Sequence, residues 1–140
     1  MSDKYFLDTN VLVYMVDRSS PQKSSVAQTM VRDALVHRKG VISFQVAQEF
    51  INVALTKFKA TMSAMELEQF FSSVLQPLIT VQSSSELYKE ALHVHRKNKI
   101  SWYDALIVAA ALEAQCAVLY SEDLQHGQTI RTLTIKNPFL

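Results

Sequence analysis

The chain alternates short apolar segments with longer stretches of helical periodicity. Four apolar segments, KYFL (4–7), GVIS (40–43), LITV (78–81) and AVLY (117–120), are too short to form helices. Such segments, separated by helical stretches, are typical of parallel strands joined by helical crossovers. The C-terminal TIRTLTIKNPFL alternates well enough to predict a terminal strand with Ile130, Leu133 and Ile135 in the core. The pattern predicts an α/β fold whose central, mostly parallel sheet of four to five strands is flanked by helices.

Helix starts are marked by capping residues. Pro21 stands at a first helical position, and an acid follows three residues after each of three further caps. The four predicted N-caps are Ser20, Ser63, Ser83 and Ser101. A further helix should follow Ser43 and run to about Phe58, with Glu49 on its polar face. The stretch ALIVAAALEA after Asp104 is apolar nearly all round, which predicts a helix packed on both sides.

Composition adds few constraints beyond size. With 140 residues, the chain is expected to form one domain over 1–140. Its formal charge of +1 gives no global positive field, so any nucleic-acid binding must be local. The lone Cys116 excludes an intramolecular disulfide and fits a reducing compartment. Because the sequence has neither a secretory signal nor a membrane-spanning apolar run, we expect a cytoplasmic protein without membrane association.

Two acids follow predicted strands directly. Asp8 comes after KYFL and Asp123 comes shortly after AVLY, and ligands in open α/β sheets gather beyond the carboxyl ends of the strands. Each acid has a local alternative, because Asp is favoured at helix N-caps and in turns. Glu122, beside Asp123, competes for any acidic role in that loop.

Two more acids lie on predicted helices. Asp104 fits a capping box with Ser101, and Glu49 fits a solvated polar stripe. The joint arrangement of four acids at one sheet edge is harder to explain locally, because clustered carboxylates raise one another's pKa unless a cation neutralises them. Ligands that are all oxygen favour Mg²⁺ or Mn²⁺. A zinc site is not indicated, because the four histidines are scattered: His37, His93, His95 and His126.

Four blocks of the sequence carry a family resemblance: FLDTNVLVY, SFQVAQEFINVAL, ISWYDALIVAAALEA and LYSEDLQHG. In this order they resemble a PIN domain of the kind found in VapC-type toxins of toxin–antitoxin pairs, and they cover the chain nearly end to end. The resemblance implies a three-layer PIN-like fold with an acidic metal site. It assigns the metal site to Asp8, Glu49, Asp104 and Asp123, with Asn10 and Ser121 in support.

The same resemblance implies a function. We expect a ribonuclease that uses Mg²⁺, with Mn²⁺ as the alternative, to hydrolyse RNA phosphodiester bonds and leave 5′-phosphate and 3′-hydroxyl ends. Asp8 and Asp104 are the first candidates for direct ligands, Asp123 is the next, and Glu49 either binds metal or holds a metal-bound water. The resemblance also implies a homodimer and an antitoxin partner bound near residues 50–71. The alternative is a catalytically inactive PIN-like module that binds RNA or protein.

Overall fold

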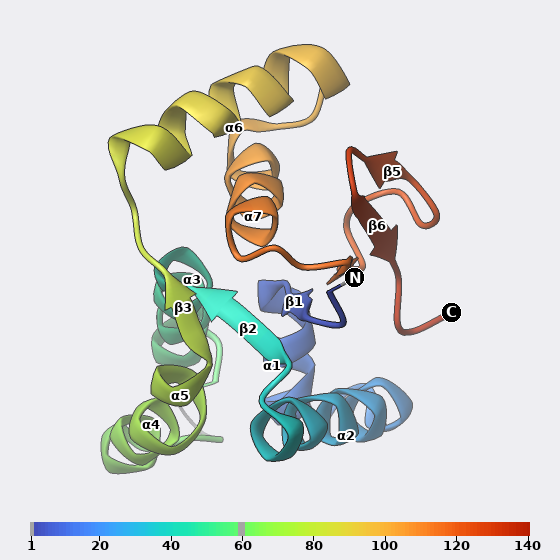
Figure 1. Cartoon of the computed structure of the whole chain (residues 1–140). Helices are drawn as coiled ribbons and strands as arrows, with labels where there is room; N and C mark the ends of the chain where they lie inside the picture. The colour runs from blue at the N-terminus through green and yellow to red at the C-terminus, as the bar shows by residue number, and fades with distance from the viewer. Residues whose placement is uncertain (1, 59–60) are drawn as a thin grey trace.

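The computed structural model describes residues 2–58 and 61–140, whose strands form one six-stranded sheet (Figure 1). The strands lie in the order β3-β2-β1-β4-β6-β5. Their bounds are Tyr5–Leu7 (β1), Gly40–Ser43 (β2), Ile79–Val81 (β3), Val118–Tyr120 (β4), Thr129–Ile130 (β5) and Leu133–Lys136 (β6). All neighbours pair in parallel except β5, which is antiparallel to β6. The carboxyl ends of the parallel strands therefore share one edge of the sheet.

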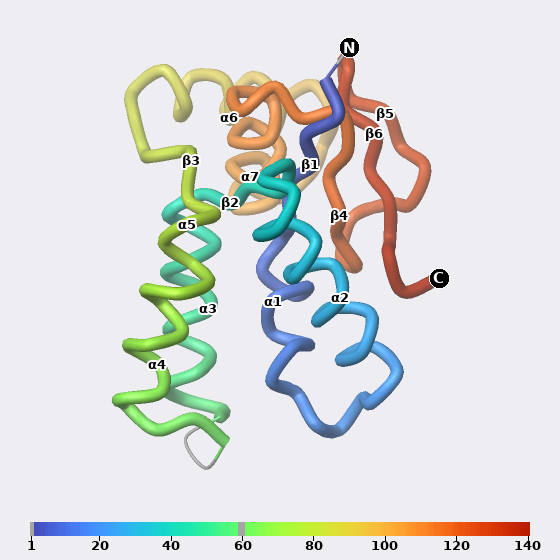
Figure 2. Tube along the Cα trace, turned by 60° about the horizontal axis from the view of Figure 1, so that its bottom comes forward, coloured from blue at the N-terminus to red at the C-terminus, as the bar shows by residue number. Residues whose placement is uncertain are grey.

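Helices cover both faces of this sheet. In chain order they are α1 (Thr9–Val16), α2 (Pro21–His37), α3 (Phe44–Thr56), α4 (Ala64–Phe70), the π-helical turn η1 (Phe71–Leu75), α5 (Gln76–Leu78), α6 (Ser85–Asn98) and α7 (Trp102–Glu113). In Figure 1, α6 and α7 lie above the sheet, and α1 and α2 lie below it. Figure 2 shows α3 and α4 side by side, extending together away from the sheet. The result is the predicted three-layer α/β arrangement.

The core is built where the sequence is most continuously apolar. All four residues of β2 are buried, and so is every residue of α7 from Ala105 to Ala111, which confirms that this helix packs on both sides. Gly40, at the start of β2, allows α2 to approach closely, because a Cβ at this position would lie 2.3 Å from the Cβ of Ala34. A side chain larger than hydrogen would force α2 away from β2.

The four short apolar segments are confirmed as β1 to β4. The C-terminal segment differs from the prediction, since it forms the hairpin β5–β6 in place of one strand and so raises the strand number to six. The predicted core residues Ile130, Leu133 and Ile135 are all buried. The alternation between Ile130 and Leu133 slips because the chain turns there, with Arg131 at φ 53°.

Three of the four predicted helix caps are confirmed. Ser20 and Ser101 precede α2 and α7, and Ser63 forms a complete capping box at the start of α4. The fourth was wrong by one residue: Ser84 caps α6 and accepts a hydrogen bond from the Leu87 amide at 3.0 Å. The helix after Ser43 ends at Thr56, slightly short of the predicted end.

In the part of the chain that the structure describes, no helix combines the length and apolar character needed to cross a bilayer.

Candidate active site

Asp8 lies at the carboxyl end of β1, where it also caps the first turn of α1. Its Oδ1 accepts a hydrogen bond from the Thr9 amide at 2.7 Å, and its Oδ2 accepts one from the Ser121 hydroxyl at 2.8 Å. The residue is only 6% exposed. The local interpretation of Asp8 as an N-cap is therefore correct, but it leaves a buried carboxylate that also contacts a second strand end.

The electrostatic environment of Asp8 opposes its negative charge. Burial raises the pKa of Asp8 from the usual 3.8 to about 6, against the hydrogen bonds from Ser121 and Thr9, which lower it. The nearby negative charges of Asp123 and Glu49 raise this pKa further. The charges of Asp123 and Glu49 are thus close enough to repel the Asp8 carboxylate, and these three residues are called the acidic group below.

Ser121 connects the ends of β1 and β4. It is fully buried, donates its hydroxyl hydrogen to Asp8, and accepts the backbone amides of Asp123 at 3.2 Å and Leu124 at 3.4 Å. One side chain therefore positions the Asp8 carboxylate and also fixes the backbone of the loop that carries Asp123. These contacts are of the kind expected for the supporting role that the family resemblance implies for Ser121.

The two neighbouring acids after β4 point to different partners. Asn10 donates its Nδ2 to Asp123 Oδ2 at 3.1 Å, which joins α1 to Asp123. Glu122 accepts hydrogen bonds from the Tyr14 hydroxyl and from Lys23 Nζ, each at 2.6 Å. Burial alone would raise the pKa of Glu122, but these two partners lower it below its ordinary value. Glu122 is thus neutralised outside the acidic group, whereas Asp123 belongs to it.

Glu49 joins the group through Thr9. The Thr9 hydroxyl donates to Glu49 Oε1 at 2.8 Å, so the residue that follows Asp8 links α1 to α3. Glu49 is half-buried and is not part of a wholly solvated stripe.

Asp104 lies on the first turn of α7, but its side chain does not join this network. Its backbone amide donates to the Ser101 hydroxyl at 3.2 Å, whereas no reciprocal bond from its carboxylate completes a capping box. Gln45 Nε2 donates to the Tyr103 carbonyl at 3.4 Å, which brings the starts of α3 and α7 together. The structure therefore places Asp104 at the same sheet edge without a hydrogen bond to the other acids.

The candidate ligands at this edge are of the chemical kind that binds divalent cations. Mg²⁺ is commonly held by one or two carboxylates while water fills its remaining positions, and all candidate ligands are oxygens. Across the described residues, no Lys or Arg forms an ion pair with Asp8, Glu49, Asp104 or Asp123. Over the same ranges, no three His, Cys, Asp or Glu side chains lie close enough to hold an ion together.

Comparison with known protein families identifies this arrangement. The family model described as "PIN domain" matches residues 5–129. The chain belongs to the PIN domain family. This match spans all four predicted acids of the PIN domain as well as its supporting Asn10 and Ser121. A comparison with curated proteins gave no match.

Solved structures share the fold of this PIN domain. A chain of a toxin–antitoxin complex from Klebsiella pneumoniae is 16% identical, with a TM-score of 0.68, over 96% of this chain and 98% of the other. A chain of VapBC2 from Rickettsia felis, bound to a DNA fragment from its promoter, is 18% identical, with a TM-score of 0.60, over 95% and 97% of the two chains. At these identities the likeness establishes the fold.

Some residues of the site could not be found from sequence. Tyr14 and Lys23 fix Glu122 although they lie 108 and 99 positions away from it, and no local pattern connects them. The only sequence signal for these contacts was that two acids, Glu122 and Asp123, stand side by side in the loop after β4.

Proposed function

We propose that this PIN domain is a divalent-metal-dependent endoribonuclease that hydrolyses RNA phosphodiester bonds. The observation that carries the proposal is a buried Asp8 held beside Asp123 and Glu49 without a neutralising cation from the described chain. A fold that maintains such repulsion needs a compensating gain, and metal binding supplies one. Membership of the PIN family supports the same chemistry.

The residues take distinct roles in this proposal. Asp8 and Asp104 are the first candidates for direct metal ligands, Asp123 is the next, and Glu49 either binds the ion or orients a water. The bound ion, Mg²⁺ or alternatively Mn²⁺, would activate water and stabilise the charge that develops on the phosphate.

Hydrogen bonds within the chain keep these acids in position. Ser121 orients Asp8, Asn10 orients Asp123, and Thr9 orients Glu49. These contacts limit the rotamers of the carboxylates, which is the usual function of groups that surround metal ligands.

The test is cleavage of structured and single-stranded RNA by purified protein with Mg²⁺, Mn²⁺ or a chelator. We expect cleavage only with metal, and its loss in Asp8→Asn. Because groups around a metal typically contribute 10–100-fold, a direct ligand should contribute about 100-fold or more, so we expect Asp123→Asn to lose at least that much.

Glu122→Gln is the matched control, because it alters the neighbouring acid that Tyr14 and Lys23 already engage. We expect it to retain most of the activity. If Asp8→Asn stays folded and cleaves as well as the wild type, the catalytic assignment fails and a binding module becomes the better account.

We further propose that the protein is the toxin of a toxin–antitoxin pair, that it forms a homodimer and that it acts on RNA in the cytoplasm. A groove of about 620 Å³ lies between α3 and the α4–η1 segment, lined by Ile51, Leu55, Leu67 and Phe71. Its position coincides with the region where the family resemblance places the antitoxin. An apolar segment of that partner would fill this groove.

A further inference from the structure

A second pocket lies beside the acidic site, at the carboxyl ends of β2 and β3. Ser43 and Val81 from these two strands line it, and its volume is about 120 Å³. Ligand pockets usually enclose roughly 300–1,000 Å³, so this one suits a single flat group better than a whole nucleotide. Its remaining polar and aromatic walls are formed by Gln45, Gln48, Gln82, Ser83, Tyr88 and Tyr103.

The polar lining consists of three Gln amides and the side chains of Ser43 and Ser83, and it carries no Asp, Glu, Lys, Arg or His. Each Gln amide offers donors and an acceptor side by side, which matches the edge of a nucleobase. Gln45 uses a donor on the Tyr103 carbonyl, whereas the amides of Gln48 and Gln82 have no hydrogen-bond partner within residues 2–58 and 61–140. Two amides are therefore free to bind a neutral polar ligand, and a phosphate would find no cation here.

Two tyrosines add aromatic surface to this pocket. Tyr88 is 47% exposed and Tyr103 is 67% exposed, although large aromatic side chains are usually well covered. The Tyr88 ring packs edge-on against Trp102, with centroids 5.9 Å apart and an interplanar angle of 79°, which restrains its orientation. Exposed aromatic rings of this kind stack on unpaired bases in single-stranded RNA.

The pocket shares two helices with the acids. Gln45 and Gln48 lie on α3 within one turn of Glu49, and Tyr103 directly precedes Asp104 on α7. An occupant of the pocket would therefore lie next to the acidic site along a bound strand. We propose that the pocket holds one unpaired RNA nucleobase beside the cleavage site and selects it by hydrogen bonds from Gln48 and Gln82. The inference rests on the proposed function, since it specifies the substrate of the same site.

The test measures binding in chelator, where no cleavage can occur. The probes are fluorescently labelled trinucleotides of A, C, G or U, the same backbone without bases, and the four nucleoside 5′-monophosphates. We expect one trinucleotide to bind at least about fivefold more tightly than the others, the discrimination typical of a good amide–base pair. Trp102, the only tryptophan, should report binding through its emission, because it contacts Tyr88.

Substitutions separate base selection from general affinity. Gln48→Ala and Gln82→Ala should reduce the preference among bases, whereas Tyr103→Ala should weaken all four trinucleotides by about tenfold. Gln22→Ala, an exposed amide on α2 away from the pocket, is the matched control and should change neither. The substituted side chains are all exposed, so circular dichroism should show unchanged folding.

Several results would overturn the inference. Equal binding of the base-free backbone would show that only the backbone is recognised, and equal binding of monophosphates would assign the pocket to free nucleotides. An unchanged base preference in both Gln variants would exclude the amides. Metal-dependent cleavage without base preference would contradict this inference alone, whereas base-selective binding without cleavage would contradict only the proposed nuclease activity.

Discussion

Asp8 combines a local and a long-range task in one carboxylate. As the N-cap of α1 it accepts the Thr9 amide, and as the end of β1 it meets Ser121 from β4. Either contact alone would explain an acid at this position. The two together bury the charge near Asp123 and Glu49, which is costly for the protein without metal.

This cost predicts how metal-free stability depends on pH. The pKa of Asp8 is about 6 in the folded protein and 3.8 in the reference state, so the folded form retains a proton that the unfolded chain has lost. The contribution of Asp8 to stability therefore falls as pH rises between about 4 and 6. Asp8→Asn should raise the metal-free unfolding free energy at pH 7 by roughly 1–3 kcal/mol.

Urea unfolding in chelator at pH 4 and pH 7 measures this effect. The increase in unfolding free energy of Asp8→Asn over wild type should be larger at pH 7 than at pH 4. Glu122→Gln should instead lower the unfolding free energy at pH 7, because the pKa of Glu122 is lowered and its charge stabilises the folded protein. An Asp8→Asn variant that is less stable than wild type at pH 7 would show that the carboxylate is structurally favourable.

At the scale of elements, Lys23 anchors the loop that carries Asp123. Its ammonium binds Glu122 and lies 4.9 Å from the centroid of the Tyr14 ring and 5.8 Å from that of Phe139. Tyr14 and Phe139 also pack edge to face at 4.9 Å. One cation thus connects α1, α2, the loop after β4 and the C-terminal segment.

Lys23→Met should loosen this loop and weaken Mg²⁺ binding severalfold, less than the 10–100-fold typical of groups that contact metal ligands directly, because Lys23 binds Glu122 and not a proposed ligand. The unfolding temperature should change little, because exposed ion pairs contribute little to stability. Lys39→Met, which removes the surface ion pair with Asp3, is the matched control and should leave Mg²⁺ affinity unchanged. Equal effects of the two substitutions would refute the anchoring role.

The elements show how far local sequence determines this fold. Four strands and most helix starts could be predicted, because apolar runs and caps act within a few residues, as at Ser63. The cap of α6 was misplaced because Ser83 and Ser84 are chemically equivalent, and only the path of the chain after β3 selects Ser84. The hairpin at Arg131 was missed because its turn lacks glycine.

Sequence patterns alone pointed only to the acids of the candidate site, and the family resemblance added Asn10 and Ser121. Asp8 and Asp123 could be predicted because they follow strands that end at the same sheet edge. The contacts that distinguish Asp123 from Glu122 come from α1 and α2, about a hundred residues away, and depend on the folded packing. The role of Asp104 stays a prediction, since its carboxylate forms no hydrogen bond or ion pair with the described residues.

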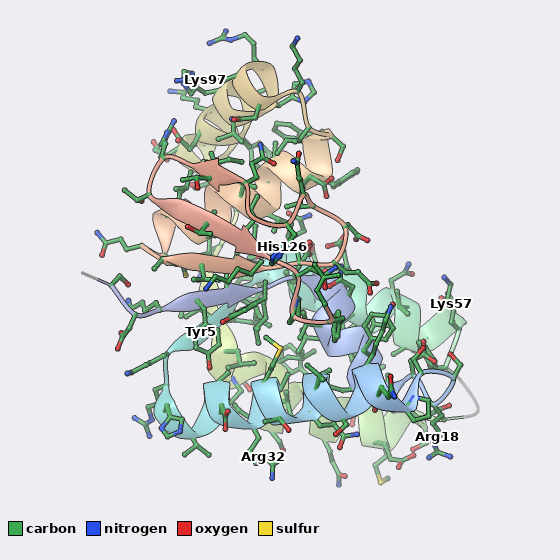
Figure 3. All side chains as sticks on the ribbon, turned by 90° about the vertical axis from the view of Figure 1, so that its right-hand side faces the viewer. Tyr5, Arg18, Arg32, Lys57, Lys97 and His126 are labelled. Atoms are coloured by element: carbon green, nitrogen blue, oxygen red, sulfur yellow. The ribbon has the colours of Figure 1, made fainter. Side chains whose placement is uncertain are left out.

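At the scale of the whole molecule, basic side chains are dispersed, and some of the exposed apolar side chains lie beside one groove. In Figure 3, Lys97 points outward at the top and Arg32 at the bottom, whereas Lys57 and Arg18 both lie at the right. RNA would therefore be positioned by local contacts, in agreement with the formal charge of +1. By contrast, large apolar side chains such as Leu55 and Met65 remain exposed near the groove between α3 and α4.

The proposed homodimer can be tested by the mass of the protein in solution. We predict that light scattering at micromolar concentration gives a mass twice the 15.9 kDa of one chain. The mass should stay unchanged in Asp8→Asn, because the acidic site is not expected to form the interface. A monomer mass over the whole concentration range would refute the dimer.

The most direct test of the central claim is a calorimetric titration of Mg²⁺ into chelator-treated protein. If Asp8, Asp123 and Glu49 belong to a cation site, wild type should bind Mg²⁺ with defined stoichiometry, and Asp8→Asn should weaken binding by at least about tenfold. Glu122→Gln should bind Mg²⁺ nearly as well as wild type, because an amide oxygen can still accept the hydrogen bonds from Tyr14 and Lys23. Absence of Mg²⁺ and Mn²⁺ binding by the folded protein, or equal affinity in Asp8→Asn, would contradict the account.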